Sequence, residues 1–253
     1  MKRAVEGSQI ARQFLSRARR IINDDEMRSL MDDVTRELGF RYFALIHHVD
    51  LRRSSPQIIH IENYPPVWAD YFIRNQVYIE DPVLNASLTT NVGFAWEAVP
   101  TMISMSRRQR EILERGRREG LGWGFTVPAN IPGDVHGSCS FATGTAQVLP
   151  QRVLLAAQLI GAFAFQAARR IRCSGLKSAS PPKLTPRQRE CLVLVAKGKT
   201  DWEIGRILGL SEETVTKYLN AARARYNVMT RAQLVTAALF DGQIGFMEIR
   251  ELQ

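Results

Sequence analysis

The chain has few cysteines and no long apolar stretch. Its 253 residues include three cysteines, Cys139, Cys173 and Cys191. Because the cysteines are odd in number and widely spaced, they provide neither a disulfide framework nor the paired ligands of a zinc site. The opening residues, Met1 to Gln9, contain no apolar run, and no stretch of membrane-spanning length follows, so the sequence predicts neither a signal peptide nor a membrane segment. We therefore expect a protein of a reducing cytoplasm.

Patterns typical of catalysis are also missing. His47 and His48 are neighbours in a strand-like stretch, so their side chains point to opposite faces and cannot share a metal ion. His60 and His136 have no cysteine or acidic residue nearby at ligand spacing. The glycines of residues 120–124 are too closely spaced for a phosphate-binding fingerprint. The sequence therefore predicts no enzyme activity, no metal site and no cofactor.

The charge of the chain is basic but unevenly placed. Its formal net charge is +9, of which residues 1–172 carry +5 and residues 184–253 only +2. This balance fits binding to nucleic acid without demonstrating it. The apolar content of 45% and the charged content of 23% are those of a folded globular protein, and the length leaves room for two domains.

A segment rich in small residues and ending in prolines divides the chain. Residues 173–183 have the composition of a flexible or extended linker. Before it, residues 1–172 mix amphipathic helical patterns near 8–22, 25–38, 65–76, 104–119 and 150–172 with strand-like runs at 42–49, 58–61, 125–128 and 139–142. We expect an α+β fold here, an antiparallel sheet between two helical layers. A pocket between sheet and helices is a natural small-molecule site.

After the linker, residues 184–253 contain the pattern of two short helices joined by a tight turn. Thr200 can cap the first helix, with Glu203 closing a capping box. Gly209 suits the left-handed residue that ends this helix, and Ser211 can cap the second one. Apolar residues fall on one face of each helix at Ile204, Ile207, Leu208, Val215, Leu219 and Ala222. This arrangement is typical of a helix-turn-helix DNA reader.

The opposite face of the second helix carries short polar and basic side chains, which can reach base edges and phosphates. The alternative is a small helical bundle with an ordinary solvated face. The residues expected to contact DNA are Thr200, Thr214, Lys217, Tyr218, Asn220, Ala221 and Arg225.

The segment from Lys183 to about Gly245 resembles the DNA-binding domain of LuxR-type transcription factors. It shares the opening run of residues 184–190, the Gly-Lys-Thr run at 198–200 and the Ser-Glu-x-Thr-Val element at 211–215, in register and without a gap. In the opening run, Thr185 can cap a helix whose capping box closes at Gln188. The resemblance implies an all-α domain of four helices.

The same kind of domain also follows phosphorylated receiver domains. Receiver chemistry needs a lysine near the phosphorylated aspartate, and no lysine occurs between Lys2 and Lys177. We therefore reject a receiver for the N-terminal part.

The N-terminal part instead resembles the LuxR-type receptors for acyl-homoserine lactones, over about residues 30–150. In that family an aromatic-rich helix precedes an Asp-Pro-Val element and a downstream tryptophan. The matching residues of this chain are Tyr64, Trp68, Asp81, Pro82, Trp96 and Gly124. The resemblance implies a ligand-binding domain that also dimerises.

The chemistry of an acyl-homoserine lactone explains these residue types. The Trp68 indole is a donor only and suits the lactone carbonyl, whereas an ionised Asp81 is an acceptor only and suits the amide N–H. Tyr64, together with Ser140, can donate to the amide carbonyl. Trp96 would be an apolar wall beside the lactone ring. Leaving a buried Asp81 unpaired would be costly, so we expect the empty domain to be unstable or disordered.

Each of these residues has a simpler alternative role. The tryptophans can be ordinary core residues, Asp81 can cap a helix starting at Pro82, and Ser140 can bond only to backbone. One position also departs from the family, because Phe72 stands where a tyrosine is usual and Tyr71 is displaced by one residue. We expect Phe72 to favour an acyl group without a 3-oxo substituent, or an aromatic or branched one.

These observations together predict a ligand-gated transcription regulator that reads a near-palindromic DNA site as a homodimer. Its expected partners are double-stranded DNA, a small-molecule autoinducer, a second copy of the chain and RNA polymerase. The final helical run of residues 231–240 is a candidate dimer contact, with Leu234, Ala237 and Ala238, although its apolar face can also simply close the domain. The alternative function is a regulator of the same fold that senses another small molecule or acts without one.

Overall fold

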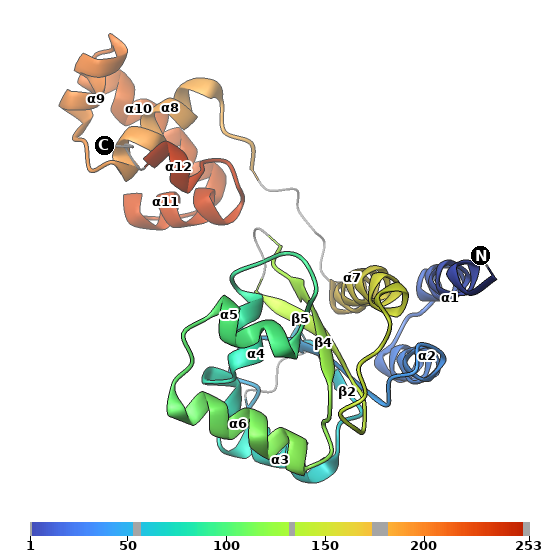
Figure 1. The fold of residues 1–253 in the computed structure, drawn as a ribbon. Coiled ribbons are helices and arrows are strands. Elements are labelled where there is room, and N and C mark those ends of the chain that lie inside the picture. The colour runs from blue at the N-terminus through green and yellow to red at the C-terminus, as the bar shows by residue number, and fades with distance from the viewer. Residues whose placement is uncertain (1, 53–56, 132–134, 174–181, 250–253) are drawn as a thin grey trace. The chain divides into compact units, whose positions relative to one another are not determined.

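One antiparallel sheet organises the N-terminal part of the chain. The computed structural model describes residues 2–52, 57–131, 135–173 and 182–249, and in these residues five strands pair in the order β2-β1-β5-β4-β3 (Figure 1). The strands are β1 (Tyr42–His47), β2 (His60–Glu62), β3 (Phe94–Ala95), β4 (Gly124–Ala129) and β5 (Gly137–Ala142). The register places Ala44 of β1 and Thr126 of β4 on either side of Ser140 of β5. These three side chains therefore share one face of the sheet.

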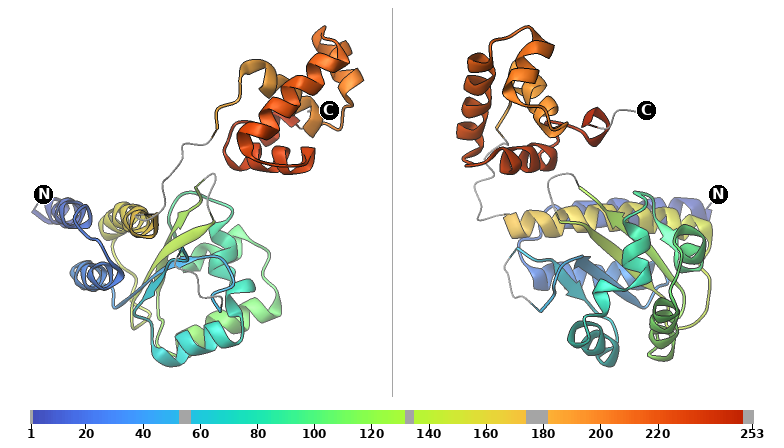
Figure 2. Two further views of the ribbon diagram at one scale, coloured as in Figure 1. Left: turned by 180° about the vertical axis from the view of Figure 1, so that it is seen from behind. Right: turned by 90° about the vertical axis from the view of Figure 1, so that its left-hand side faces the viewer.

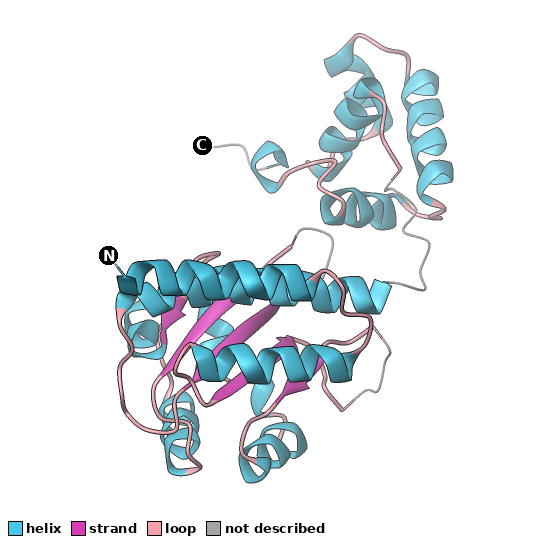
Figure 3. Cartoon of the chain, turned by 90° about the vertical axis from the view of Figure 1, so that its right-hand side faces the viewer, coloured by secondary structure: helices cyan, strands magenta, loops and turns pink. Residues whose placement is uncertain are grey.

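The other face of the sheet is covered by long helices. They are α1 (Lys2–Ala18), α2 (Asp24–Glu37) and α7 (Gln151–Cys173), and Figure 3 shows the long helices in front of the strands. Phe43 and Phe141 of the sheet pack with Met31 of α2 and Phe165 of α7, all nearly inaccessible to solvent. This is the main core of the domain. None of the described helices is both long and apolar enough to cross a membrane.

Shorter helices cover the face that carries Ser140. They are α3 (Pro66–Arg74), α4 (Pro82–Ser87), α5 (Val99–Met102) and α6 (Arg107–Arg118), with 3-10 turns at Val77–Ile79 and Trp96–Ala98. Figure 2 shows the sheet between the two helical layers. The α+β sandwich predicted from the sequence is therefore confirmed. Trp68, Phe72, Ile112 and Leu121 form a separate apolar cluster on this side.

The long elements lie within a few residues of their predicted positions, but several short ones are not predicted. The helix expected at 8–22 runs instead from Lys2 to Ala18, and the strand expected at 58–61 is His60–Glu62. Neither β3 nor α4 nor α5 is predicted, because two to six residues are too few for a periodic pattern.

The C-terminal residues form a second compact unit of helices. They are α8 (Pro186–Ala196), α9 (Asp201–Leu208), α10 (Glu212–Tyr226), α11 (Arg231–Phe240) and α12 (Phe246–Ile249). Their common core includes Leu192, Ile204, Val215 and Leu234. Ile207, expected on the apolar face of α9, is instead 55% exposed, because α9 turns only its Ile204 side fully into this core.

The linker expected at 173–183 falls mostly outside the described residues. α7 extends through Cys173, and residues 174–181 are not described. The domain boundaries at 172 and 184 therefore stay predictions. Cys139 and Cys191 are buried free thiols.

Candidate functional site

A cavity that is partly open to solvent lies between the sheet and the shorter helices. The structure brings all six residues expected to bind ligand to its wall: Tyr64, Trp68, Phe72, Asp81, Trp96 and Ser140. Apart from these, its lining is apolar, with Ala44 and Ile46 from β1 and Leu84 and Ile112 from the helices. A mostly apolar cavity with a few convergent polar groups is the usual form of a small-molecule site.

Asp81 uses one of its two carboxylate oxygens to cap α4. Oδ1 accepts hydrogen bonds from the backbone N–H groups of Val83 at 2.8 Å and Leu84 at 2.9 Å. Asp81 therefore does cap a helix, as the simpler alternative proposed. The expectation of an unpaired carboxylate in the empty domain does not hold for Oδ1, because this oxygen accepts two hydrogen bonds. No described residue donates to Oδ2. Burial raises the pKa of Asp81 to about 6 against the opposing effect of the two backbone hydrogen bonds.

A chain of hydroxyl groups crosses the sheet beside the cavity. The indole Nε1–H of Trp96 donates to Thr126 Oγ1 at 2.9 Å, and Thr126 Oγ1 lies 2.8 Å from Ser140 Oγ. Ser140 also hydrogen-bonds the hydroxyl of Tyr64, whose pKa is raised well above its ordinary value mainly by burial. The Tyr64 phenol is therefore neutral and able to donate. Ser140 bonds to side chains and not only to backbone.

A glycine allows the Trp96 ring to approach the cavity, and a second glycine lies beside the Trp68 ring. A Cβ at Gly124 would lie 2.3 Å from the Trp96 ring, which no side chain can tolerate, so β4 needs a glycine there. The Trp68 ring packs against Gly116 of α6, where a Cβ would sit 3.5 Å away. Trp68 Nε1 has no hydrogen-bond partner among the described residues, so its N–H is available to a ligand.

Phe72 and Tyr71 lie on different sides of α3, as their one-residue displacement requires. Phe72 faces the cavity. Tyr71 faces elsewhere: the Arg115 guanidinium lies 3.5 Å from its ring centroid, and Arg108 Nη2 donates to its hydroxyl at 3.3 Å. The cavity therefore has no phenol at this position, which makes that part of its wall apolar.

The helix-turn-helix pattern in the C-terminal unit is confirmed by its caps. Thr200 with Glu203 and Thr185 with Gln188 each form a complete capping box, and the Ser211 hydroxyl accepts the Thr214 N–H. Gly209 is left-handed with φ 67°. A Cβ at Gly205 of α9 would lie 2.7 Å from the Leu210 carbonyl oxygen, so a glycine is also needed where the turn folds back.

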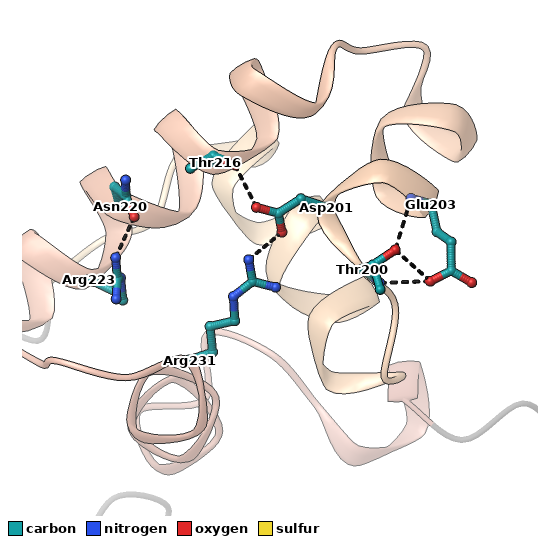
Figure 4. Close-up of polar contacts among 7 residues, drawn as sticks. All are labelled: Thr200, Asp201, Glu203, Thr216, Asn220, Arg223 and Arg231. Carbon is teal, nitrogen blue, oxygen red and sulfur yellow. Dashed lines mark hydrogen bonds and ion pairs between the residues drawn. The ribbon is translucent and has the colours of Figure 1, made fainter.

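The buried Asp201 carboxylate joins the two helices of the motif to α11. The Asp201 carboxylate accepts hydrogen bonds of 2.6 Å each from Thr216 of α10 and Arg231 of α11 (Figure 4). Asp201 is 7% exposed. The sequence did not predict this contact, although an aspartate right after the Thr200 cap is a possible signal, because helix starts favour acidic residues.

The residues expected to contact DNA have different surroundings. Three of them are exposed on α10 and lie outside the apolar core of the domain: Lys217, Asn220 and Ala221. Lys217 pairs with Glu213 at 2.9 Å, and Asn220 accepts a hydrogen bond from Arg223. Thr214 is half-buried, with its hydroxyl 2.7 Å from Ser211 Oγ.

The remaining three are already engaged within the domain. Tyr218 is half-buried against the core. Arg225 donates to the Lys183 carbonyl at 2.8 Å, so it ties the chain before α8 to α10. The Thr200 hydroxyl is held by the Glu203 carboxylate (Figure 4). A DNA contact by these groups would have to share or replace an existing hydrogen bond.

Two of the three residues considered for dimer contact on α11 are buried inside the domain. Leu234 and Ala238 have no exposed surface, whereas Ala237 is half-buried. The apolar face of α11 therefore closes the domain core, and Leu234 and Ala238 are not free to meet a second chain.

Comparison with known proteins agrees with this architecture. Residues 23–171 match the family described as "Autoinducer binding domain", and residues 182–238 match "Bacterial regulatory proteins, luxR family". The chain is 26% identical to the transcriptional activator protein LuxR of Aliivibrio fischeri over 228 residues, which cover 88% of this chain and 89% of LuxR.

Two solved structures share the fold. SdiA in complex with octanoyl-rac-glycerol has a TM-score of 0.59 at 24% identity, covering 91% of this chain and 93% of SdiA. The N-acylhomoserine lactone dependent factor CepR2 from Burkholderia cenocepacia has a TM-score of 0.53 at 15% identity, covering 66% of this chain and 98% of CepR2. With both family matches in the same order along one chain, this protein belongs to the LuxR family of quorum-sensing transcription regulators and combines an autoinducer-binding domain with a helix-turn-helix DNA-binding domain.

Proposed function

We propose that this regulator binds an N-acyl-homoserine lactone in the cavity and reads a near-palindromic DNA site as a homodimer. The observation that carries the first part is the convergence of polar groups on one apolar cavity. The Asp81 Oδ2 and the Trp68 indole have no described partner, and the neutral Tyr64 phenol lines the same wall. An amide N–H, a lactone carbonyl and an amide carbonyl complement these three groups.

In this arrangement each ligand group meets one side chain. The amide N–H donates to Asp81 Oδ2, while Oδ1 keeps its cap on α4. The Trp68 Nε1–H donates to the lactone carbonyl, and the Tyr64 hydroxyl donates to the amide carbonyl, with Ser140 beside it. Trp96 is the apolar wall of the lactone ring, since its own N–H already bonds to Thr126.

We propose that Phe72 selects the acyl group. Because Tyr71 is held by Arg108 and Arg115 away from the cavity, no phenol at this position can bond a 3-oxo group. An unsubstituted, aromatic or branched acyl group should therefore bind better than its 3-oxo analogue. Equal affinity for a matched pair of 3-oxo and unsubstituted ligands would contradict this preference.

The DNA-binding part of the proposal rests on the exposed side of α10. A single helix-turn-helix reads too few base pairs for genomic specificity, and two-fold pairing lets two copies read both halves of a near-palindrome. Ligand would stabilise the folded N-terminal domain and so favour the dimer. Since LuxR is named a transcriptional activator, we propose RNA polymerase as a partner of the DNA-bound dimer.

The decisive experiment is expression with and without a mixture of acyl-homoserine lactones, followed by mass spectrometry of the purified protein. Asp81→Asn is the test variant and Asp70→Asn, at an exposed position of α3, is the control. We expect a lactone to be retained by wild type and by the control but lost by Asp81→Asn. A soluble wild-type protein that retains no lactone would contradict the proposal.

An acylglycerol is the second candidate ligand, because SdiA has been solved with octanoyl-rac-glycerol. Such a molecule has an ester carbonyl for Trp68 but no amide N–H for Asp81. Adding octanoylglycerol to the same mixture distinguishes the two. Retention of the acylglycerol instead of a lactone, unaffected by Asp81→Asn, would favour this alternative.

A further inference from the structure

The side chains of β1 alternate between the core and the cavity, and this alternation continues past the end of the strand. Ala44 and Ile46 line the cavity. His47 points the other way, with its ring 5.3 Å from that of Phe165 on α7. His48 therefore follows Ile46 on the cavity side of the sheet.

His48 is held there by the neighbouring strand. Its Nε2 lies 3.0 Å from the hydroxyl oxygen of Ser138, and its backbone N–H donates to the His136 carbonyl at 2.8 Å. Ser138 is two residues before Ser140 on β5, which places it about 6.6 Å farther along the same face. His48 and Ser138 thus form a polar pair on the cavity side of the sheet. They lie beyond Ile46, where the nearby residues Ile46 and Leu84 are apolar.

The second ring nitrogen of His48 has no partner. Nδ1 is buried, and no described residue lies within hydrogen-bond distance of it. Buried polar atoms in native proteins are nearly always bonded, so an exception calls for an explanation. Burial, followed by repulsion from His136 and His47, lowers the pKa of His48 to about 4. The ring is therefore neutral, with one nitrogen a donor and the other an acceptor.

Leu84 lies between this histidine and the ligand cavity. The Leu84 side chain lines the ligand cavity and also lines a second, more open cavity bordered by His48 and Tyr78. Leu84 lies between the two cavities, so a ligand whose polar head lies at Asp81 and Trp68 reaches His48 by pushing the Leu84 side chain aside.

We propose that the acyl group of the natural ligand carries a hydroxyl near its far end, which hydrogen-bonds Nδ1 of His48. This inference rests on the proposed function, since it assumes that the head of the ligand binds at Asp81. A hydroxyl can both donate and accept, so it satisfies Nδ1 in either tautomer of the ring. His48 is then a specificity-determining residue for the acyl group.

The test compares octanoyl-homoserine lactone with 8-hydroxyoctanoyl-homoserine lactone, by titration of the full-length protein. Wild type should bind the hydroxylated compound about fivefold to tenfold more tightly, the effect of one net hydrogen bond. His48→Phe should reverse this preference, because it removes the acceptor and adds apolar surface. His136→Phe changes an exposed neighbour of the same type and should leave the preference unchanged.

The outcomes separate this inference from the proposed function. Equal or weaker binding of the hydroxylated compound by wild type would overturn the role of His48 while leaving lactone binding intact, and this comparison holds even if His48→Phe does not fold. The same preference in His48→Phe as in wild type would also overturn it. Failure of wild type to bind either lactone would overturn the proposed function and this inference with it.

Discussion

The two carboxylate oxygens of Asp81 have different surroundings, and this difference gives the residue two separable roles. Oδ1 caps α4, and Oδ2 is the acceptor that we propose for the ligand. Burial raises the pKa of the carboxyl from 3.8 to about 6, so the folded protein holds this proton more tightly than the unfolded chain does. Between those two values the contribution of Asp81 to stability therefore falls as pH rises.

Asp81→Asn should stabilise the empty protein at neutral pH. Asparagine caps a helix as well as aspartate does, but it carries no buried charge. A difference of about two pKa units corresponds to about 3 kcal/mol. Chemical unfolding should therefore show the variant more stable than wild type by up to about 3 kcal/mol at pH 7.5 and nearly equal to it at pH 4. If Asp81→Asn were less stable than wild type at pH 7.5, the prediction that the buried Asp81 charge destabilises the empty protein would be wrong.

Ligand affinity should depend on pH through the same carboxyl. A protonated Asp81 in the empty protein must lose its proton before it can accept the amide N–H, so affinity should be constant above about pH 7 and fall below pH 6. At pH 5 we expect binding about tenfold weaker than at pH 7.5, measured by titration calorimetry. Affinity that is flat over this range would argue against an ionised Asp81 as the acceptor.

At the level of helices, the motif in the C-terminal unit is fixed by contacts at both ends of its turn. Gly205 allows the turn to approach α9 closely, and Asp201 joins α9 to α10 and α11 through Thr216 and Arg231. The position of α10 against α9 therefore depends on a buried charge whose partner comes from a third helix.

Arg231→Ala should loosen this arrangement. Asp201 is 7% exposed and would lose its ion partner, although Arg231 is itself 46% exposed, so we expect a cost of about 1–3 kcal/mol instead of the larger value for a fully buried pair. Hydrogen exchange should rise in α9 and α10. Arg187→Ala, which breaks an exposed pair with Glu190, is the control and should change exchange little.

Across both domains, the chain separates the proposed ligand site from the proposed DNA surface. The cavity is built from residues of the N-terminal unit alone, and α10 belongs to the other unit. Ligand uptake and DNA contact should therefore be affected by different substitutions, and the coupling between them should appear only in the full-length protein.

Lys217→Ala should weaken DNA binding and leave ligand uptake unchanged. Lys217 is exposed, and its partner Glu213 is exposed too, so the ammonium can leave it for a phosphate at little cost. Losing one phosphate contact should make the slope of the logarithm of the binding constant against the logarithm of the salt concentration shallower by about one. Arg74→Ala on α3 removes an exposed cation of the other domain and serves as control. Loss of ligand uptake in Lys217→Ala would contradict the separation of the two sites.

Local pattern was enough to predict the caps and the longer helices. The boxes at Thr185 and Thr200 and the left-handed Gly209 involve residues at most a few positions apart, so their sequence specifies them directly. The six proposed ligand residues came from family resemblance and spacing, and all of them line one cavity. Thr126 and Leu84 were not predicted, because a threonine or leucine in such a segment has no distinctive pattern.

The sequence thus determined what depends on neighbours along the chain: the helical periodicities, the caps, and the sheet-forming segments. Only the tertiary structure decided which strands pair and what surrounds each side chain. The pairing of β5 with β1 joins segments about 95 residues apart in the chain and sets Ser138 beside His48. The pairing of β5 with β4 sets Ser140 beside Thr126. It also showed that Arg225 and Tyr218 are engaged within their own domain. Such contacts depend on packing between distant segments, which no local pattern specifies.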